Sequence, residues 1–104
     1  MQASFAARQE GDVLIVEIRG RLTLGEPVDR FAEIVARNRN VVLNLRDLEY
    51  LDSAGLGELI SLNRKAMLRL VNVPRRVSDL LQLTGSQALF DIQPDEQAAI
   101  MSFR

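Results

Sequence analysis

The chain has 104 residues, with 13 basic and 14 acidic side chains, a net charge of −1, and neither cysteine nor histidine. Without these two residue types it cannot build a Ser-His-Asp or Cys-His triad, or a zinc site of histidine and cysteine ligands. The balanced charge and the scarcity of aromatic residues give no basis for nucleic-acid binding. No apolar run could span a membrane, and no signal peptide is evident. We therefore expect one cytoplasmic domain, residues 1–104, that is not an enzyme and has no cofactor, metal, membrane contact or small-molecule substrate.

The first half of the chain predicts a β-hairpin, a helix and a buried strand. Residues 3–9 form the first strand, Glu10-Gly11-Asp12 is typical of a turn, and residues 13–18 form a second strand that Gly20 ends. A helix opens at Glu26-Pro27, because proline is favoured in a first helical turn. Residues 41–45 are almost continuously apolar, which predicts a strand that is central in a sheet or covered on both faces. The apolar positions of the helix, at helical spacing, are Val28, Phe31, Ile34 and Val35.

The second half of the chain predicts alternating helices and strands. A helix begins at about Ser53, directly after the strand 41–45, and residues 68–73 form the next strand. Pro74 starts a third helix that Gly85 closes as the residue after the C-cap. A short strand over residues 89–92 and a helix from Pro94 follow. The order ββαβαβαβα predicts an α/β fold, with a mixed sheet of about four to five strands flanked by about four helices. The inward positions predicted for the third helix are Val77, Leu80, Leu81 and Thr84.

The segment Asp52-Ser53-Ala54-Gly55-Leu56-Gly57 stands at a predicted strand-to-helix turn. Ser53 or Asp52 can cap the helix, and a serine at a helix N-terminus can also accept a phosphoryl group. These two interpretations are compatible, and both stay open. Two glycines in a first helical turn cost about 1 kcal/mol each relative to alanine, so close approach by another backbone or by a partner should offset that cost. The segment matches neither a P-loop nor a dinucleotide fingerprint.

Residues along the whole chain resemble the STAS domain family, and more narrowly the bacterial anti-sigma-factor antagonists. The Asp52–Gly57 motif alone is only moderately specific, but its combination with the other segments in register is highly specific. The segments that carry the resemblance are residues 20–24 (Gly-Arg-Leu-Thr-Leu), 42–45 (Val-Leu-Asn-Leu), the motif itself, 70–77 (Leu-Val-Asn-Val-Pro-Arg-Arg-Val), 80–85 (Leu-Leu-Gln-Leu-Thr-Gly) and 89–90 (Leu-Phe).

The resemblance implies a partner-switching cycle and assigns its residues. The family's phosphorylation site maps onto Ser53. The unphosphorylated antagonist binds an anti-sigma factor that is itself a serine kinase, phosphorylation releases that partner, and a phosphatase resets the cycle. A phosphate adds nearly two negative charges at one interface point, and like-charge contact or desolvation there can cost several kcal/mol. The predicted partner surface consists of Asp52, Ser53, Ala54, Gly55, Leu56, Gly57, Arg75 and Arg76.

The connection after the second helix departs from this family pattern. The family usually places several residues there, whereas Arg64-Lys65-Ala66-Met67 runs almost directly into the next strand. A parallel crossover needs a turn of about 2–6 residues. We therefore expect either a truncated helix or residues missing from the sequence.

Other charged clusters have a functional and a structural interpretation. Asp47, Glu49 and Asp52 could act as acid and base, but a solvated or capping role is favoured. The same holds for the acids Asp91, Asp95 and Glu96, which lack calcium-loop spacing and suit a helix start. The basic residues Arg64, Lys65 and Arg69 could bind phosphate, although a solvated face is favoured.

Three function classes follow, in order of preference. The first is the phosphorylation-controlled binding module described above. The second is a non-switching STAS scaffold, or an accessory subunit of a regulatory or lipid-transport assembly. The third, a small enzyme, is disfavoured because histidine, cysteine and a cofactor loop are missing.

Overall fold

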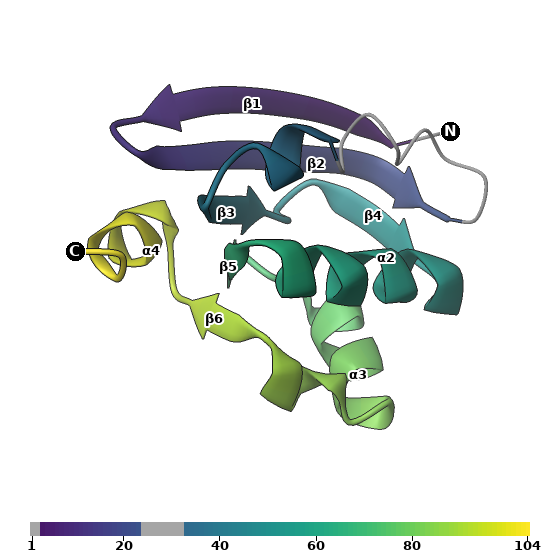
Figure 1. Cartoon of the computed structure of the whole chain (residues 1–104). Helices are drawn as coiled ribbons and strands as arrows, with labels where there is room; N and C mark the ends of the chain where they lie inside the picture. Colours follow the sequence, from purple (N-terminus) through teal and green to yellow (C-terminus); the bar gives the residue numbers. More distant parts are fainter. Residues whose placement is uncertain (1–2, 24–32) are drawn as a thin grey trace.

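The computed structural model describes residues 3–23 and 33–104, and it is an α/β fold built on a mixed sheet (Figure 1). The sheet has six strands in the order β1-β2-β3-β5-β6, and β4 pairs with β2 beside this path. The β1–β2 pair is antiparallel and the other pairs are parallel. The predicted fold class is therefore confirmed, with one strand more than expected. The elements are β1 (Ser4–Glu10), β2 (Val13–Leu22), β3 (Asn40–Asn44), β4 (Leu48–Leu51), α2 (Ser53–Lys65), β5 (Met67–Val71), α3 (Arg75–Leu83), a 3₁₀ helix (Ser86–Leu89), β6 (Asp91–Gln93) and α4 (Glu96–Met101).

The predicted hairpin and central strand are both present. Gly11 adopts a positive φ of 61° in the turn between β1 and β2, a conformation that glycine accepts without steric cost. β3 lies between β2 and β5, and four of its five residues are buried. Residues 33–36 form a helical turn in which Val35 is fully buried and Ile34 is 38% exposed. The earlier part of that predicted helix, including Pro27, Val28 and Phe31, lies outside the described residues.

Alternation along the strands divides the apolar side chains between the two faces of the sheet. The larger cluster joins alternate residues of β2, β3 and β5 to α2 and α3, with Leu59, Leu62 and Leu81 almost completely buried. The smaller cluster joins the other alternate residues to α4 through Ala99. Figure 1 accordingly shows α4 (yellow) apart from α2 and α3 (green). The first half of α2 therefore packs on the larger core, through Leu56 and Leu59.

Several predicted boundaries were wrong, and local backbone geometry explains two of them. β2 does not end at Gly20, because that residue takes a positive φ of 87° and the pairing of β2 shifts register there. β2 then continues to Leu22 and pairs with β4, a strand that the sequence did not predict. Ser53 therefore follows β4 rather than the third strand. At the other end of the sheet, β5 stops before Asn72, whose φ is 53°, and β6 begins two residues later than expected.

The short connection between α2 and β5 needs neither a truncated helix nor missing residues. α2 has 13 residues, and Ala66 alone separates it from β5. The Ala66 N–H still donates to the Leu62 carbonyl, 3.2 Å away, while its own backbone is already extended at φ −146° and ψ 163°. The next residue, Met67, donates to the Arg39 carbonyl at 2.8 Å. One residue thus serves as both the helix C-cap and the link to the strand.

A polar network holds α4 on the second face of the sheet. Buried Asn44 donates to Glu96 Oε2 at 2.6 Å, and its own Oδ1 accepts from the Arg46 backbone N–H and from Asn72 Nδ2. Arg8 of β1 donates to the other oxygen of Glu96. Burial raises the pKa of the Glu96 carboxyl, but the hydrogen bonds from Arg8 and Asn44 outweigh it, so the pKa is lowered overall. Glu96 therefore ties α4 to both β1 and β3.

We expect Glu96→Gln to reduce stability at neutral pH and to lose this effect in acid. The lowered folded-state pKa means that the carboxylate stabilises the fold above the ordinary glutamate pKa of about 4.3, and that this contribution disappears as the pH falls through the lower folded-state value. Urea unfolding of both proteins between neutral pH and acid measures the gap. Glu10→Gln is the control, since Glu10 contacts the same Arg8 from an exposed position at 3.7 Å. A gap that stays constant or widens in acid would contradict the assignment.

Candidate functional site

The first turn of α2 separates the capping residue from the exposed serine. Asp52 is the N-cap, and its Oδ1 accepts the Gly55 backbone N–H at 2.7 Å. Ser53 is the first helical residue, is exposed, and its hydroxyl makes no hydrogen bond with the described residues. The expectation of a solvent-exposed serine at a helix N-terminus is confirmed. Of the two capping interpretations, the one naming Asp52 is correct.

The two glycines of this turn have opposite surroundings. A Cβ on Gly55 would lie 2.3 Å from the carbonyl oxygen of Leu22 and 2.8 Å from a side-chain carbon of Leu51. The close approach expected from the sequence is thus supplied by the end of β2. A Cβ on Gly57 would meet nothing within 4 Å, and Gly57 is exposed. Within the described residues, packing explains Gly55 and leaves Gly57 without a structural reason.

Ser53 lies on an open groove between the start of α2, β4 and α3. The groove has a volume of about 560 Å³. Its apolar lining includes Leu83, a residue that is 85% exposed, and Tyr50, which is 39% exposed. The guanidinium carbon of Arg21 lies 4.3 Å from the centre of the Tyr50 ring, which orients that ring. The described residues that line the groove are Tyr50, Leu51, Asp52, Ser53, Arg76, Val77, Asp79, Leu80 and Leu83.

The predicted partner residues divide into exposed and supporting positions. Ser53, Gly57, Arg75 and Arg76 are exposed, Asp52 and Ala54 are half-buried, and Gly55 and Leu56 are buried beneath them. Arg76 lines the groove and donates from Nη1 to the Glu49 carbonyl at 2.8 Å. Its neighbour Arg75 is also exposed but does not line the groove. The motif and the start of α3 therefore meet at one place, through Arg76.

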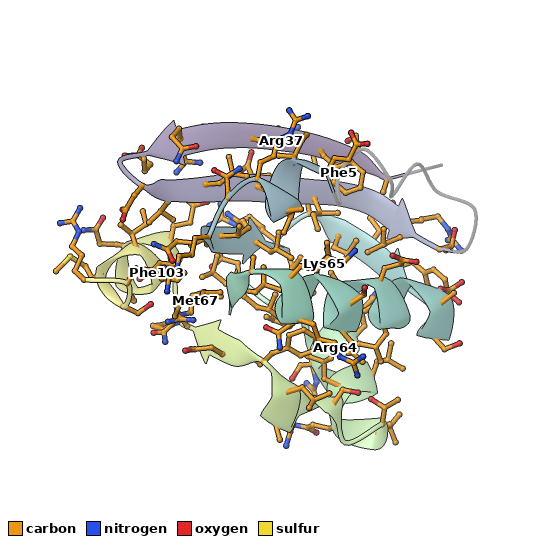
Figure 2. All side chains as sticks on the ribbon, in the orientation of Figure 1. Phe5, Arg37, Arg64, Lys65, Met67 and Phe103 are labelled. Carbon is orange, nitrogen blue, oxygen red and sulfur yellow. The ribbon has the colours of Figure 1, made fainter. Side chains whose placement is uncertain are left out.

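The other basic candidates lie away from the groove. Arg64 and Lys65 are exposed in the last turn of α2 (Figure 2), which a 13-residue helix puts about 18 Å from Ser53. Arg69 is not on a solvated face. Its side chain is 14% exposed, and it contacts Asp91 at 3.2 Å and the ring of Phe103 at 4.3 Å. Arg69 therefore connects β5 to β6 and to the C-terminal segment.

The acidic candidates occupy structural positions, and Asp47 and Asp91 contact arginine side chains. Asp47 lies 3.8 Å from Arg19, while Glu49 is on β4 rather than in a loop and offers its carbonyl to Arg76. Asp91 is on β6 and not at a helix start, whereas Asp95 caps α4 by accepting the Ala98 N–H at 2.8 Å. Across residues 3–23 and 33–104 no group of acidic side chains is arranged to hold a metal ion. No helix in the described part of the chain is long and apolar enough to cross a membrane.

Sequence reasoning missed the apolar half of the groove. Tyr50 was not expected at a site because β4 was not predicted, whereas Leu80 packs against the core as expected and also lines the groove. The exposure of Leu83 could have been anticipated, because it falls off the helical face that Val77 and Leu81 define, both of which are 1% exposed. An apolar residue at an outward helical position was the available signal.

Comparison with known proteins agrees with this architecture. The STAS domain model matches residues 4–99, and a STAS-domain containing protein of Pseudomonas aeruginosa (strain UCBPP-PA14) is 30% identical over 91 residues, covering 80% of this chain and 90% of that protein. The chain belongs to the STAS domain family.

Solved structures share the fold at low identity. An anti-sigma factor antagonist from Mycobacterium paratuberculosis superposes with a TM-score of 0.84 at 18% identity, covering 97% of this chain and 93% of that one. The phosphorylated form of the Bacillus cell fate determinant SpoIIAA gives 0.71 at 17% identity, covering 97% and 100%. A sulfate transporter family protein from Wolinella succinogenes gives 0.71 at 22% identity, covering 89% and 85%. At these identities the likeness shows the fold.

We expect Gly55→Ala and Gly57→Ala to change stability in opposite directions. Alanine at 55 would collide with the Leu22 backbone carbonyl, which cannot rotate away, so the free energy of unfolding should fall by about 2 kcal/mol or more. Alanine at 57 enters open space in a helix and should raise it by up to about 1 kcal/mol. Chemical unfolding of both variants measures the difference. Equal destabilisation of the two variants would show that the surroundings of residue 57 are also closed.

We expect Asp52→Ala to cost about 1 kcal/mol of stability, because it removes the bond to the Gly55 N–H. Ser53→Ala should change stability by less than about 0.5 kcal/mol, since Ser53 is exposed and is not the cap. Thermal and urea unfolding of the two variants, with Asp52→Asn as a capping-competent control, distinguishes them. A larger loss for Ser53→Ala than for Asp52→Ala would reverse the assignment.

Proposed function

We propose that the chain is an anti-sigma-factor antagonist that works in the cytoplasm as one STAS domain, and that phosphorylation of Ser53 controls it. The observation that carries the proposal is the position of Ser53: exposed, first in α2, free of hydrogen bonds to the described residues, and on an open groove. Unphosphorylated, the chain binds an anti-sigma factor that is a serine kinase. That kinase phosphorylates Ser53 and dissociates, and a phosphatase restores the first state.

Electrostatics support release without a change of fold. A phosphoryl group brings nearly two negative charges to Ser53, directly beside the Asp52 carboxylate, which is committed to capping. In the free protein these charges face water, so their repulsion is screened. In a complex the same charges would be desolvated or would meet a partner built for a neutral hydroxyl. A loss of about 3 kcal/mol there lowers affinity more than a hundredfold.

The surface around Ser53 fits a protein partner. Leu83, Tyr50 and Leu80 supply apolar area to the lining of the groove, and Arg76 and Asp79 supply polar positions. Gly57 leaves the helix surface flat one turn beyond Ser53, so a partner backbone can approach closely there. The groove is open rather than enclosed, which favours docking of a protein over capture of a small molecule.

A second candidate function is a STAS scaffold or accessory subunit that is not switched. The observation in its favour is that a sulfate transporter family protein shares the fold. Such a module would keep the groove as a docking surface and would not need a kinase. Phosphate transfer therefore separates the two candidates.

We expect the serine-kinase anti-sigma factor of the same genome to add a single phosphate to the chain in the presence of ATP. Ser53→Ala should block the transfer and still bind the kinase as tightly as the wild-type chain, whereas Ser53→Asp should bind about tenfold more weakly, because it adds one charge of the two. Intact mass and titration calorimetry measure these outcomes. Ser61→Ala, on the same helix about two turns away, is the control and should be labelled normally. Labelling at another residue, together with wild-type affinity of Ser53→Asp, would overturn the switch.

A further inference from the structure

Arg76 and Ser53 border the same groove from two different helices. Arg76 stands in the first turn of α3 and Ser53 in the first turn of α2. The other charged side chains of the groove are Asp52 and Asp79, and its remaining titratable group is Tyr50, which stacks with Arg21. Among the described lining residues, Arg76 is therefore the single cation of the groove that Ser53 borders.

The guanidinium of Arg76 is held weakly. It donates one hydrogen bond, to the neutral carbonyl of Glu49 at 2.8 Å, and a guanidinium has five N–H donors. Within the described residues it forms no ion pair, in contrast to Arg8, Arg19 and Arg69. Arginine side chains prefer planar, bidentate contacts to phosphate oxygens, and such charge-assisted bonds are stronger than a single bond to a carbonyl. Arg76 is thus exposed, only partly satisfied, and on the same groove as the proposed modification site.

We propose that Arg76 is the internal receptor for the phosphoryl group on Ser53: on phosphorylation its guanidinium leaves the Glu49 carbonyl and binds the phosphate oxygens across the groove. The inference rests on the proposed modification of Ser53 and deepens it, because it adds a regulatory contact within the free protein. The movement is a side-chain rotation, in keeping with a fold that does not rearrange.

The contact has two consequences for the switch. It offsets the repulsion between the phosphate and the carboxylates of Asp52 and Asp79, so the phosphorylated chain remains stable on its own. It also removes the guanidinium from the partner surface at the moment when the phosphate appears, and closes the groove between α2 and α3. Two features that an anti-sigma factor would contact, the Ser53 hydroxyl and the Arg76 side chain, would therefore be lost together.

The test uses phosphoserine built into position 53 during translation, so that no kinase is needed. Four phosphorylated proteins are compared: the otherwise wild-type chain, Arg76→Gln, Arg76→Lys and the control Arg75→Gln. Arg75 is a matched control because it is exposed on the same helical turn but does not line the groove. Phosphorus NMR titration gives the second pKa of the phosphate in each. We expect this pKa to be about half a unit higher in Arg76→Gln than in the wild-type chain. Arg76→Lys should be intermediate, and Arg75→Gln should match the wild-type chain.

Two results would overturn the proposal. One is an identical phosphate pKa in the wild-type chain and Arg76→Gln. The other is an equal rise in Arg75→Gln, which would reveal a general charge effect and no specific contact. Circular dichroism and thermal melts of the unphosphorylated variants check that Arg76→Gln is folded. Because the phosphate is installed directly, a kinase that fails to label Ser53 would refute the proposed function and leave this titration unaffected.

Discussion

The contact between Gly55 and the end of β2 fixes the start of α2, and with it Ser53, against the sheet. The Leu22 carbonyl oxygen stands only 2.3 Å from the position that a Cβ on residue 55 would occupy. Residue 22 also pairs with Leu51 of β4, and its carbonyl lies 3.5 Å from the Asp52 backbone nitrogen. Strand end, strand β4 and helix start are therefore packed at one point. Because the backbones touch there, the direction of the first turn of α2 is set by sterics, and Ser53 has little freedom to move toward the core.

Asp52 and Ser53 have separate roles at the start of α2, so the proposed modification of Ser53 would not disturb the helix cap. A phosphorylated N-cap serine would lose or alter its capping bond, so the charge change would also alter helix stability. Here the cap bond belongs to Asp52 and the exposed hydroxyl to the next residue. A phosphoryl group on Ser53 would change the surface of the domain and leave the helix start in place. This arrangement is compatible with the proposed switch, in which the surface charge changes and the backbone does not.

Most of the fold could be predicted from the sequence because its main elements have recognisable local sequence patterns. β3 is an unbroken apolar run, α2 and α3 carry apolar residues at helical spacing, and Gly11 and Gly85 both adopt the positive φ that their turn positions require. β4 could not be predicted in this way. It has four residues, two of them exposed, and it is defined by pairing with the part of β2 beyond the register shift at Gly20. That pairing joins residues about 30 positions apart, so no local pattern reports it. The groove was missed with it, since Tyr50 and Leu51 are among its lining residues.

Local features that disfavour the free protein gather around this groove. Gly57 weakens an exposed helical turn with no close approach to explain it. Leu83 leaves an apolar side chain 85% exposed at the groove wall. α3 begins with Arg75 and Arg76, where positive charge opposes the helix dipole, and its N-cap Pro74 provides no side-chain hydrogen bond. On the other face of the sheet, in contrast, Asp95 caps α4 and Asn44 and Glu96 satisfy one another. Departures from local stability rules are expected at functional surfaces, and Ser53 stands on the groove near which these departures lie.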